Sequence, residues 1–501
     1  MKRALLYLAL PYFALPGFAF AQPANMTQQP GPVASAPAPA LAPDIYVAPL
    51  AGFAYSDFGT PAAVVARHSD PATGSVTVTY DTGARLVVRP DPTSEGPVAV
   101  EVAIGSGRSG VPASLVHALW SSILMPLGGT QRISYADLDS WQQQSGTSVN
   151  VQLIPDISAW RLSATTTPSD LITEVALLAA YARDGAYGGN LGPRIASMAP
   201  VIAAQIEASP FKVYARVVQH ALFGATSRYS DLPDATDLDA TRGDELAPML
   251  KEPLGEAPDI AIAGNIDVDK AINTVATTLA AGDIRKRTAF APAVIEPQQS
   301  ASHVWRSFHN GNPSQAWTGL YWPIDAGHAG APVNVDRAAL QVLALVLDGR
   351  LKHTLGKPAE ADGEAFAVAL SSVEFDRAGW LGLGAPWAAN ALAAGRQTLA
   401  TLVADIVRHP PTSDELAAAR TALSASFEAA RRDNAWWAHN LALRLHSDGA
   451  IPLPVGAADL SALTDEDLRD FAARHCVGRA AFVIEAIPAR ARPGAASGVA
   501  P

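Results

Sequence analysis

The chain has 501 residues, of which 49% are hydrophobic and 17% are charged, and its formal net charge is -11. This length and apolar content predict roughly two to four domains with cores of their own rather than one ordinary domain. Because the net charge is negative and Lys and Arg form no run longer than three residues, the composition excludes a nucleic-acid-binding role that depends on a basic surface.

The first 21 residues have the pattern of an export signal. Lys2 and Arg3 form a positive start, residues 5–18 are apolar, and Ala-Phe-Ala at 19–21 is a cleavage site before Gln22. A membrane anchor is the alternative, but the apolar stretch is short for a bilayer and is interrupted by prolines. We therefore predict cleavage between Ala21 and Gln22 and a periplasmic or secreted mature protein with no membrane span.

Three segments rich in proline or polar residues divide the remaining chain. They are interpreted as a tether at 22–43, a linker at 285–302 and a flexible tail at 489–501. The segments between them, 44–284 and 303–488, are interpreted as an N-terminal and a C-terminal domain.

These two blocks repeat each other in pattern, with an offset of roughly 220 residues. In the first block a strand-like run, Val98–Ile104, precedes a Gly-rich loop and a helical run, Leu115–Leu127. In the second block Ala316–Ile324 precedes a similar loop and the helical run Arg337–Leu347. Later, FKVYARVVQHALF in the first block matches NAWWAHNLALRLH in the second. Short links between strands favour antiparallel pairing, so we predict two similar α+β domains, each a largely antiparallel sheet with helices on one face.

Five segments, taken in order, resemble the insulinase (pitrilysin) metallopeptidases, in particular their bacterial two-domain, mitochondrial-processing-peptidase-like members. The segments are SVTVTYDTGARLVVRPDP, PDIAIAGNIDVDKAINTVATTLAAG, VNVDRAALQVLALVLDGRLKHTL, TSDELAAARTAL and ALTDEDLRDFAARH. The resemblance covers residues 75–488. It implies two homologous domains of the metallohydrolase (processing-peptidase-like) type that face each other as a half-clamshell.

Catalysis in that family uses an inverted zinc motif, His-x-x-Glu-His, on the first helix. If His117 is aligned with the first His, Trp120 replaces the catalytic Glu and Ser121 replaces the second His. If the Gly-Thr at the helix end is aligned instead, the three positions are Trp120, Ile123 and Leu124. Neither alignment leaves a zinc site, so the resemblance implies a degenerate metal motif and no expected cofactor.

Other site positions of the family also differ here. The later zinc-binding Glu would fall near Gln205 or Glu207. Active members hold the peptide backbone with an Arg and a Tyr, where this chain has a Gly and Phe366; Arg350 or Lys357 could supply a substitute cation. Arg350, Lys357 and Phe366 are therefore the candidate peptide-binding residues, and no catalytic residue is predicted.

Several remaining residues are given structural interpretations. His439 and His446 lie two helical turns apart, too far to chelate one ion, and are interpreted as a solvated helix face. Cys476, the single cysteine, is interpreted as a buried small hydrophobe. Four tryptophans could line a peptide-binding surface, but core packing is the favoured interpretation: Trp317, Trp322, Trp436 and Trp437.

The leading functional hypothesis is a non-catalytic subunit of the cell envelope. It would pair with a zinc-bearing homologue, as a heterodimer, to form a peptide-degrading chamber. A stand-alone periplasmic peptide- or protein-binding module is the first alternative. An active zinc metallopeptidase with an unrecognised site is the second alternative, and zinc is expected as a cofactor only in that case.

Overall fold

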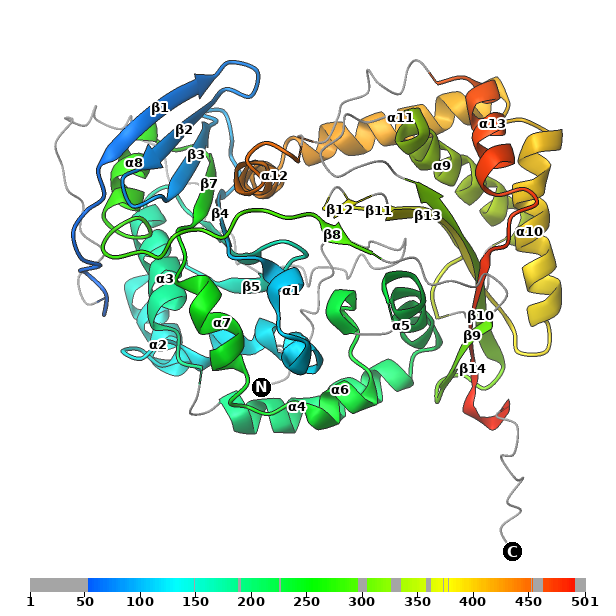
Figure 1. Cartoon of the computed structure of the whole chain (residues 1–501), viewed down its shortest axis with the longest axis horizontal. Helices are drawn as coiled ribbons and strands as arrows, with labels where there is room; N and C mark the ends of the chain where they lie inside the picture. The colour runs from blue at the N-terminus through cyan, green and yellow to red at the C-terminus, as the bar shows by residue number, and fades with distance from the viewer. Residues whose placement is uncertain are drawn as a thin grey trace, which may run out of the picture.

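The computed structural model describes residues 53–147, 149–187, 191–224, 227–295, 304–325, 335–356, 362–372, 374–376, 378–451, 453 and 463–491. The predicted signal peptide, the tether, Lys357 and most of the tail lie outside these ranges. Within them the chain forms two lobes, each built on one large β-sheet with helices (Figure 1). The exact domain and linker boundaries given above stay predictions.

The first sheet has seven strands in the order β1-β2-β3-β7-β4-β6-β5. All neighbouring strands are antiparallel except β3 and β7, which are parallel. The strands are β1 (Val64–Asp70), β2 (Ser75–Tyr80), β3 (Arg85–Pro90), β4 (Val98–Ile104), β5 (Gln152–Pro155), β6 (Trp160–Thr166) and β7 (Asp259–Gly264).

The second sheet has five strands in the order β11-β13-β10-β14-β9, and only β14 and β9 are parallel. Its order and pairing match the run β5-β6-β4-β7-β3 of the first sheet, so the predicted internal repeat and the largely antiparallel sheets are confirmed. The strands are β9 (Val304–His309), β10 (Gln315–Asp325), β11 (Phe366–Ser371), β13 (Ala378–Ala388) and β14 (Phe482–Pro488). Two short strands, β8 (Ala293–Val294) and β12 (Phe375–Asp376), form a separate parallel pair.

Helices account for most of the remaining described chain. Before residue 296 they are α1 (Gly107–Gly110), η1 (Ala113–Gly128), α2 (Tyr135–Ser145), α3 (Leu171–Asp184), α4 (Leu191–Glu207), α5 (Pro210–Phe223), η2 (Ser227–Tyr229), α6 (Ala235–Ala240), α7 (Leu246–Leu254) and α8 (Val268–Ala276). After it they are α9 (Val335–Leu355), α10 (Leu392–Arg408), α11 (Ser413–Ala430), α12 (Asn434–His446), α13 (Asp465–His475) and η4 (Ala489–Ala491). Capping boxes begin α11 at Thr412 and α13 at Thr464, where a Thr hydroxyl and an acidic side chain satisfy the first free backbone N–H groups.

The two domains exchange equivalent helices. Helix α5, from the first domain, packs on β14, β9 and β10 of the second sheet, whereas α12, from the second domain, packs on β4, β7 and β3 of the first sheet. Figure 1 shows α12 against the first lobe and α5 against the second. The prediction of helices on one face therefore holds only within each domain, because the other domain's helix covers the opposite face.

Strand alternation explains why the first sheet accepts α12. Successive side chains of a strand point to opposite faces. On β4, Val98, Val100 and Val102 lie in the main core, whereas Ala99 and Ala103 lie in a separate cluster with α12. Small side chains on that face let the helix approach closely, and they leave the larger aliphatic residues for the core on the other side.

The second sheet uses glycine in the same role. The face of β10 and β13 toward α5 carries large aromatic side chains, including Trp317 and Tyr321. A Cβ on Gly384 would lie 2.7 Å from both the Phe366 ring and the Tyr214 hydroxyl. The absence of a side chain at this glycine makes room for the aromatic residues that join α5 to the sheet.

The structure tests the structural interpretations made from sequence. Cys476 is buried, as predicted, and so are Trp317, Trp322 and Trp437, whereas Trp436 is partly exposed. The solvated face predicted for His439 and His446 is wrong. His446 is 1% exposed and His439 points at the buried Glu101, because α12 turns this face onto the first sheet.

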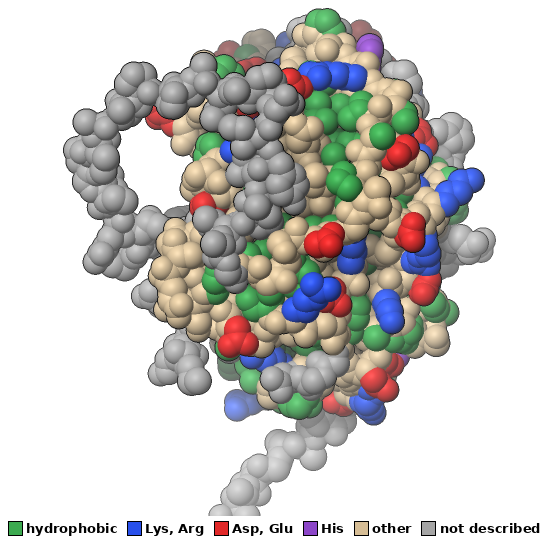
Figure 2. All heavy atoms as spheres, turned by 90° about the vertical axis from the view of Figure 1, so that its left-hand side faces the viewer, with side chains coloured by type: hydrophobic (Ala, Val, Ile, Leu, Met, Phe, Trp, Pro, Cys, Tyr) green, Lys and Arg blue, Asp and Glu red, His purple; other side chains and the backbone are tan. Residues whose placement is uncertain are grey.

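The outer surface carries mixed charges. On the side of the first domain shown in Figure 2, acidic and basic side chains are interspersed rather than gathered into one patch. Among the described helices, none has the length and apolar character needed to cross a bilayer.

Candidate functional site

The segment that corresponds to the family's zinc helix is η1. It is helical, as predicted, but over its 16 residues the hydrogen bonding is of the 3₁₀ type. Such runs are uncommon beyond a few residues, and they have three residues per turn instead of 3.6. Positions four apart are then rotated by about 120° rather than about 40°, so they no longer share a face. The spacing on which the His-x-x-Glu-His motif depends is therefore lost in the backbone as well as in the side chains.

The three side chains of the first alignment each have a structural partner. His117 Nε2 lies 2.9 Å from Oε1 of Glu245, which precedes α7. Trp120 donates its indole N–H to the hydroxyl of Thr241 at 2.8 Å, and Ser121 donates to the carbonyl oxygen of Ala118 at 2.7 Å. The first two contacts fasten η1 to the segment between α6 and α7, whereas the Ser121 bond lies within η1, and the three do not converge on a common point.

The second alignment, with Trp120, Ile123 and Leu124, also provides no metal-binding side chain. Trp120 and Leu124 are buried, and Ile123 packs against the core. Within the described ranges, no group of three or more His, Cys, Asp or Glu residues is arranged to hold a metal ion. The residues present therefore do not fit the zinc ion that the fold family implies.

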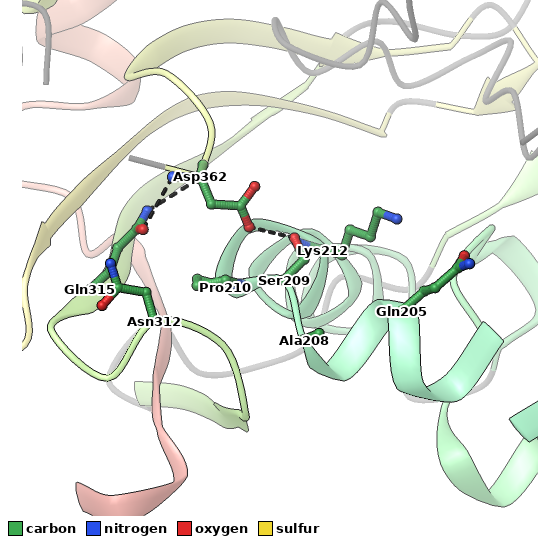
Figure 3. A pocket seen from close by; sticks show the side chains of 8 residues that line it. All are labelled: Gln205, Ala208, Ser209, Pro210, Lys212, Asn312, Gln315 and Asp362. Carbon is green, nitrogen blue, oxygen red and sulfur yellow. Dashed lines mark hydrogen bonds between the residues drawn. The ribbon is translucent and has the colours of Figure 1, made fainter. Parts of the chain in front are cut away.

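The candidates for the later zinc-binding Glu lie at the end of α4. Glu207 forms an ion pair with Arg216 of α5, with 2.7 Å between Oε1 and Nη1. Gln205 lines an open cleft of about 460 Å³ (Figure 3). The other lining residues come from both halves of the chain: Ala208, Ser209, Pro210, Lys212, Asn312, Gln315 and Asp362.

Most polar groups of this cleft are already hydrogen-bonded. Asp362 accepts hydrogen bonds from the Ser209 hydroxyl at 2.6 Å and from the backbone N–H of Phe211 at 3.3 Å, at the start of α5. The Gln315 amide is bonded to the backbone of Asp362. The cleft is therefore a polar contact region between the two domains.

The predicted peptide-binding residues are dispersed. Arg350 on α9 makes a two-point ion pair with Glu415, at 2.7 and 2.8 Å, and donates to the carbonyl oxygens of His409 and Pro410. Phe366 is fully buried among Phe211, Tyr214 and Trp317, so its ring offers no exposed surface to a peptide. Lys357 lies outside the described residues. A peptide-binding role for these three residues stays a prediction.

Buried charges gather instead under α12, a feature that sequence reasoning missed. Arg161 on β6 pairs with both Glu101 and Asp156, and all three are at least nine-tenths buried. Burial raises the pKa of Asp156 to about 7, against the opposing effect of Arg161. No local sequence motif predicts this cluster, because its members come together only when β4, β6 and the β5–β6 turn are assembled.

Comparison with known proteins identifies the fold. No protein-family model matches the sequence, and no curated protein is significantly similar to it. Solved structures do match. A protease from Helicobacter pylori has a TM-score of 0.66 and 14% identity, over 83% of this chain and 99% of that chain. The inactive domain of an M16 peptidase from Pseudomonas fluorescens has a TM-score of 0.62 and 14% identity, over 83% and 98%.

A third structure shows how this chain relates to longer proteins. The periplasmic protease PqqL from Escherichia coli matches with a TM-score of 0.63 and 13% identity, over 92% of this chain but only 49% of PqqL. The chain thus spans about half the length of that protein. Together the matches establish an insulinase-type (M16) peptidase fold with two homologous α+β domains.

Proposed function

We propose that this chain is a non-catalytic subunit of an insulinase-type peptidase in the cell envelope, and that it pairs with a zinc-bearing homologue to enclose a peptide-degrading chamber. The observation that carries the proposal is that the side chains of η1 at the zinc-binding positions make structural hydrogen bonds instead. Where active members place two His and a Glu, this chain has His117 bonded to Glu245, Trp120 to Thr241 and Ser121 to a backbone carbonyl. A zinc site needs about three protein ligands and an open position, and η1 supplies at most one imidazole.

The relation to PqqL supports the pairing. A chain that matches about half of a longer protease is of the size expected for one of two halves. The similar Pseudomonas fluorescens domain is itself described as inactive, so an M16 fold without catalysis has a precedent among the matches. In such an arrangement this subunit would contribute chamber wall and peptide-binding surface. Localisation in the periplasm follows from the predicted signal peptide and stays part of the proposal.

The first test is the metal content of the mature protein, purified and dialysed, with and without added zinc. We expect zinc far below one equivalent per chain. Stoichiometric zinc would contradict the proposal and favour an active metallopeptidase, with His117 and Glu207 the first residues to replace. A matched His117→Gln variant should bind as little zinc as the parent chain, because the proposal gives His117 no metal-binding role.

The second test is reconstitution. A homologue from the same genome with an intact His-x-x-Glu-His motif should form a complex with this chain and cleave peptides faster than it does alone. A chain that stays monomeric beside that homologue, yet binds peptides, would support the alternative of a stand-alone binding module. A neighbouring gene that encodes such a homologue would identify the partner to test.

A further inference from the structure

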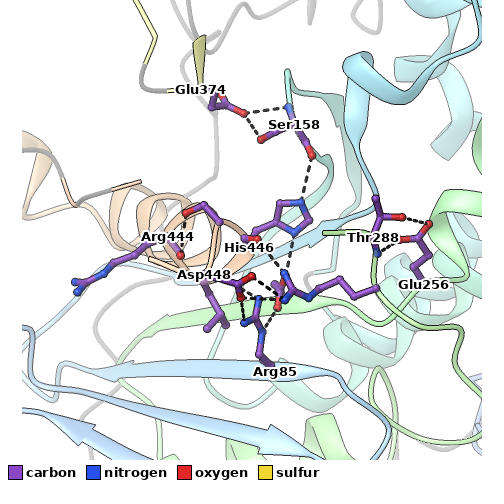
Figure 4. Close-up of polar contacts among 12 residues, drawn as sticks. Arg85, Ser158, Glu256, Thr288, Glu374, Arg444, His446 and Asp448 are labelled. Atoms are coloured by element: carbon purple, nitrogen blue, oxygen red, sulfur yellow. Dashed lines mark hydrogen bonds and ion pairs between the residues drawn. The ribbon is translucent and has the colours of Figure 1, made fainter. Parts of the chain in front are cut away.

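A polar network with a buried centre joins the two domains at the end of α12. It goes beyond the proposed function because it concerns the contact between the two domains of this chain. Figure 4 shows it between α12 and the first domain. Its members, the seam network, are Arg85, Ser158, Asp259, Arg287, Glu374, His446 and Asp448. Glu374, His446 and Asp448 come from the second half of the chain. The other members belong to the first domain or to the segment that follows it.

His446 is the centre of this network and is 1% exposed. Its Nδ1 lies 2.9 Å from Oδ2 of Asp259, and its Nε2 lies 3.2 Å from the carbonyl oxygen of Ser158. A carbonyl oxygen and an ionised carboxylate can only accept hydrogen bonds, so both contacts are hydrogen bonds only when both ring nitrogens carry a proton. The imidazolium makes two bonds across the seam, whereas the neutral ring makes one and leaves a buried acceptor without its donor.

Hydrogen-bond donors and positive charges surround the carboxyl group of Asp259. Its Oδ1 accepts from Arg85 Nε at 2.6 Å, and Arg287 Nη1 lies 3.7 Å from its Oδ2. The same two arginines donate to carbonyl oxygens at the end of α12, those of Leu445 and His446. The C-terminal end of a helix favours positive charge, so the arginines and the imidazolium are all placed where the helix dipole stabilises them.

Glu374 forms the second link. Its Oε1 accepts from the backbone N–H of Ser158 at 3.0 Å and also from the Ser158 hydroxyl. Its Oε2 is buried and has no hydrogen-bond partner within the described part of the chain. Burial raises the pKa of Glu374, against the opposing hydrogen bonds from Ser158. A carboxylic acid fits this site better than a carboxylate, because a buried oxygen without a donor is costly when it is charged.

We propose that the seam network is a proton-dependent latch. With His446 as the imidazolium and Glu374 as the carboxylic acid, it fastens α12 and the segment before β12 to the first domain. Loss of either proton loosens that attachment. Docking of the domains is therefore strongest at mildly acidic pH and weakens as the pH rises.

Among the ionisable groups near the latch, Arg161 and His446 act to lower the pKa of Glu374, but burial has the larger effect and raises it. Asp156 lies behind Ser158, and it too keeps its proton longer than an ordinary Asp. Burial acts to raise the pKa of Asp448, but Arg85 and Arg287 outweigh that effect and keep it ionised. The remaining charged groups that face this region are Arg161 on β6, Glu101 on β4 and His439 on α12.

The test is hydrogen–deuterium exchange of the full mature chain at a series of pH values between about 6 and about 8.5. Exchange at residues 440–448 and 155–160 is corrected for the intrinsic pH dependence of the amide rate. We expect protection at both segments to fall with pH, by up to about tenfold per pH unit for each proton released. The described residues of α10, which packs on β10, β13 and α13 in the second domain, should show no such trend.

Two variants assign the protons. Glu374→Gln is neutral at every pH, so we expect it to keep more protection than the parent chain at the alkaline end and to have a shallower profile. His446→Gln cannot carry the charge, so its protection at about pH 6 should resemble that of the parent at alkaline pH. His309→Gln is the matched control, since His309 is also 1% exposed but bonds to Gln315 within its own domain. Its seam profile should equal that of the parent chain.

The latch is overturned if protection at the seam in the parent chain is independent of pH. It is also overturned if Glu374→Gln retains the full pH dependence, an outcome that does not require the His446 variant to fold. A pH trend that His309→Gln abolishes to the same degree as His446→Gln would likewise place the effect outside the seam. None of these outcomes depends on zinc or on a partner subunit, so they leave the proposed function undecided in either direction.

Discussion

The hydroxyl of Tyr214 on α5 lies 2.9 Å from the hydroxyl of Tyr321 on β10, and both rings are buried. One residue belongs to the first domain and the other to the second, 107 positions later in the chain. Their contact is possible because β10 and β13 carry glycines beneath the rings. The exchange of α5 and α12 thus depends on specific small residues as much as on the aromatic side chains.

Gly319→Ala should weaken the packing of α5 on the second sheet. A Cβ at Gly319 would overlap the Tyr214 hydroxyl and lie 2.8 Å from the carbonyl oxygen of Leu383 on the neighbouring strand. Overpacking of this kind costs about 1–3 kcal/mol, and loss of the buried hydroxyl pair adds about 1 kcal/mol. We expect the urea midpoint to fall accordingly. Gly349→Ala in α9 is the matched control, since open space surrounds it and Ala favours a helix by up to about 1 kcal/mol.

The exchange also marks how far sequence could predict this fold. The runs Val98–Ile104 and Ala316–Ile324 matched β4 and β10 closely, because alternation, turn residues and apolar content are local signals. Local signals do not say which sheet an amphipathic helix covers. The face of α12 that bears His439 and His446 has the polarity of a surface helix, so it was assigned to solvent although it packs on the first sheet.

The candidate site was predictable in one respect and not in another. The mismatch at His117, Trp120 and Ser121 could be seen directly in the residue types. The 3₁₀ hydrogen bonding of η1 could not, since the same apolar pattern is typical of an α-helix. The seam network also could not be predicted from the sequence, because Ser158 and Glu374 are 216 residues apart and neither belongs to a motif.

Asp156→Asn should flatten the pH dependence of stability. Burial raises the pKa of Asp156 to about 7 from an ordinary 3.8, so the folded chain binds a proton that the unfolded chain releases. The stabilisation is present below about pH 4 and is lost as the pH rises through about 7, with a total on the order of a few kcal/mol. Asn removes this titration, so the free energy of unfolding should vary less between these limits.

Urea unfolding at a series of pH values measures this effect. Asp467→Asn is the control. Its hydrogen bonds with Thr464 lower the pKa of Asp467, so its contribution is lost only as the pH falls below an ordinary carboxyl value. The slope of stability against pH between about 5 and 7 should therefore survive in Asp467→Asn and shrink in Asp156→Asn. Equal slopes in the two variants would show that Asp156 is ionised in the folded chain.

Cys476 should be inert in the folded protein. It is 3% exposed, and burial raises the pKa of its thiol to about 12. The thiolate is the reactive form, so alkylation at about pH 8 should require at least local unfolding. We expect one equivalent of label per chain in urea and far less in buffer over the same time. Rapid labelling in buffer would mean that the C-terminal end of α13 opens readily.

Arg350 should prove to be a structural residue. Its two-point pair with Glu415 lowers the pKa of that carboxyl to about 2 and ties α9 to the start of α11. Glu415→Gln keeps the capping box with Thr412, because Gln serves there as well as Glu, and so it removes only the ion pair. We expect a loss of about 1 kcal/mol at neutral pH, which is modest because the pair is partly exposed.

The pair can be separated from a role in peptide binding by a double-mutant cycle. Arg350→Met should cost more than Glu415→Gln, because it also removes the hydrogen bonds to the carbonyl oxygens of His409 and Pro410. The double variant should cost little more than Arg350→Met alone, because each single change already breaks the pair. Lys352→Met, which breaks only the exposed contact with Asp348, should cost less than about 0.5 kcal/mol. The penalty of Glu415→Gln should shrink as the pH falls from an ordinary carboxyl value toward about 2, where the parent chain also loses the charge. If Arg350→Met instead leaves stability unchanged but weakens the binding of a peptide, the ion pair is incidental and Arg350 serves the peptide.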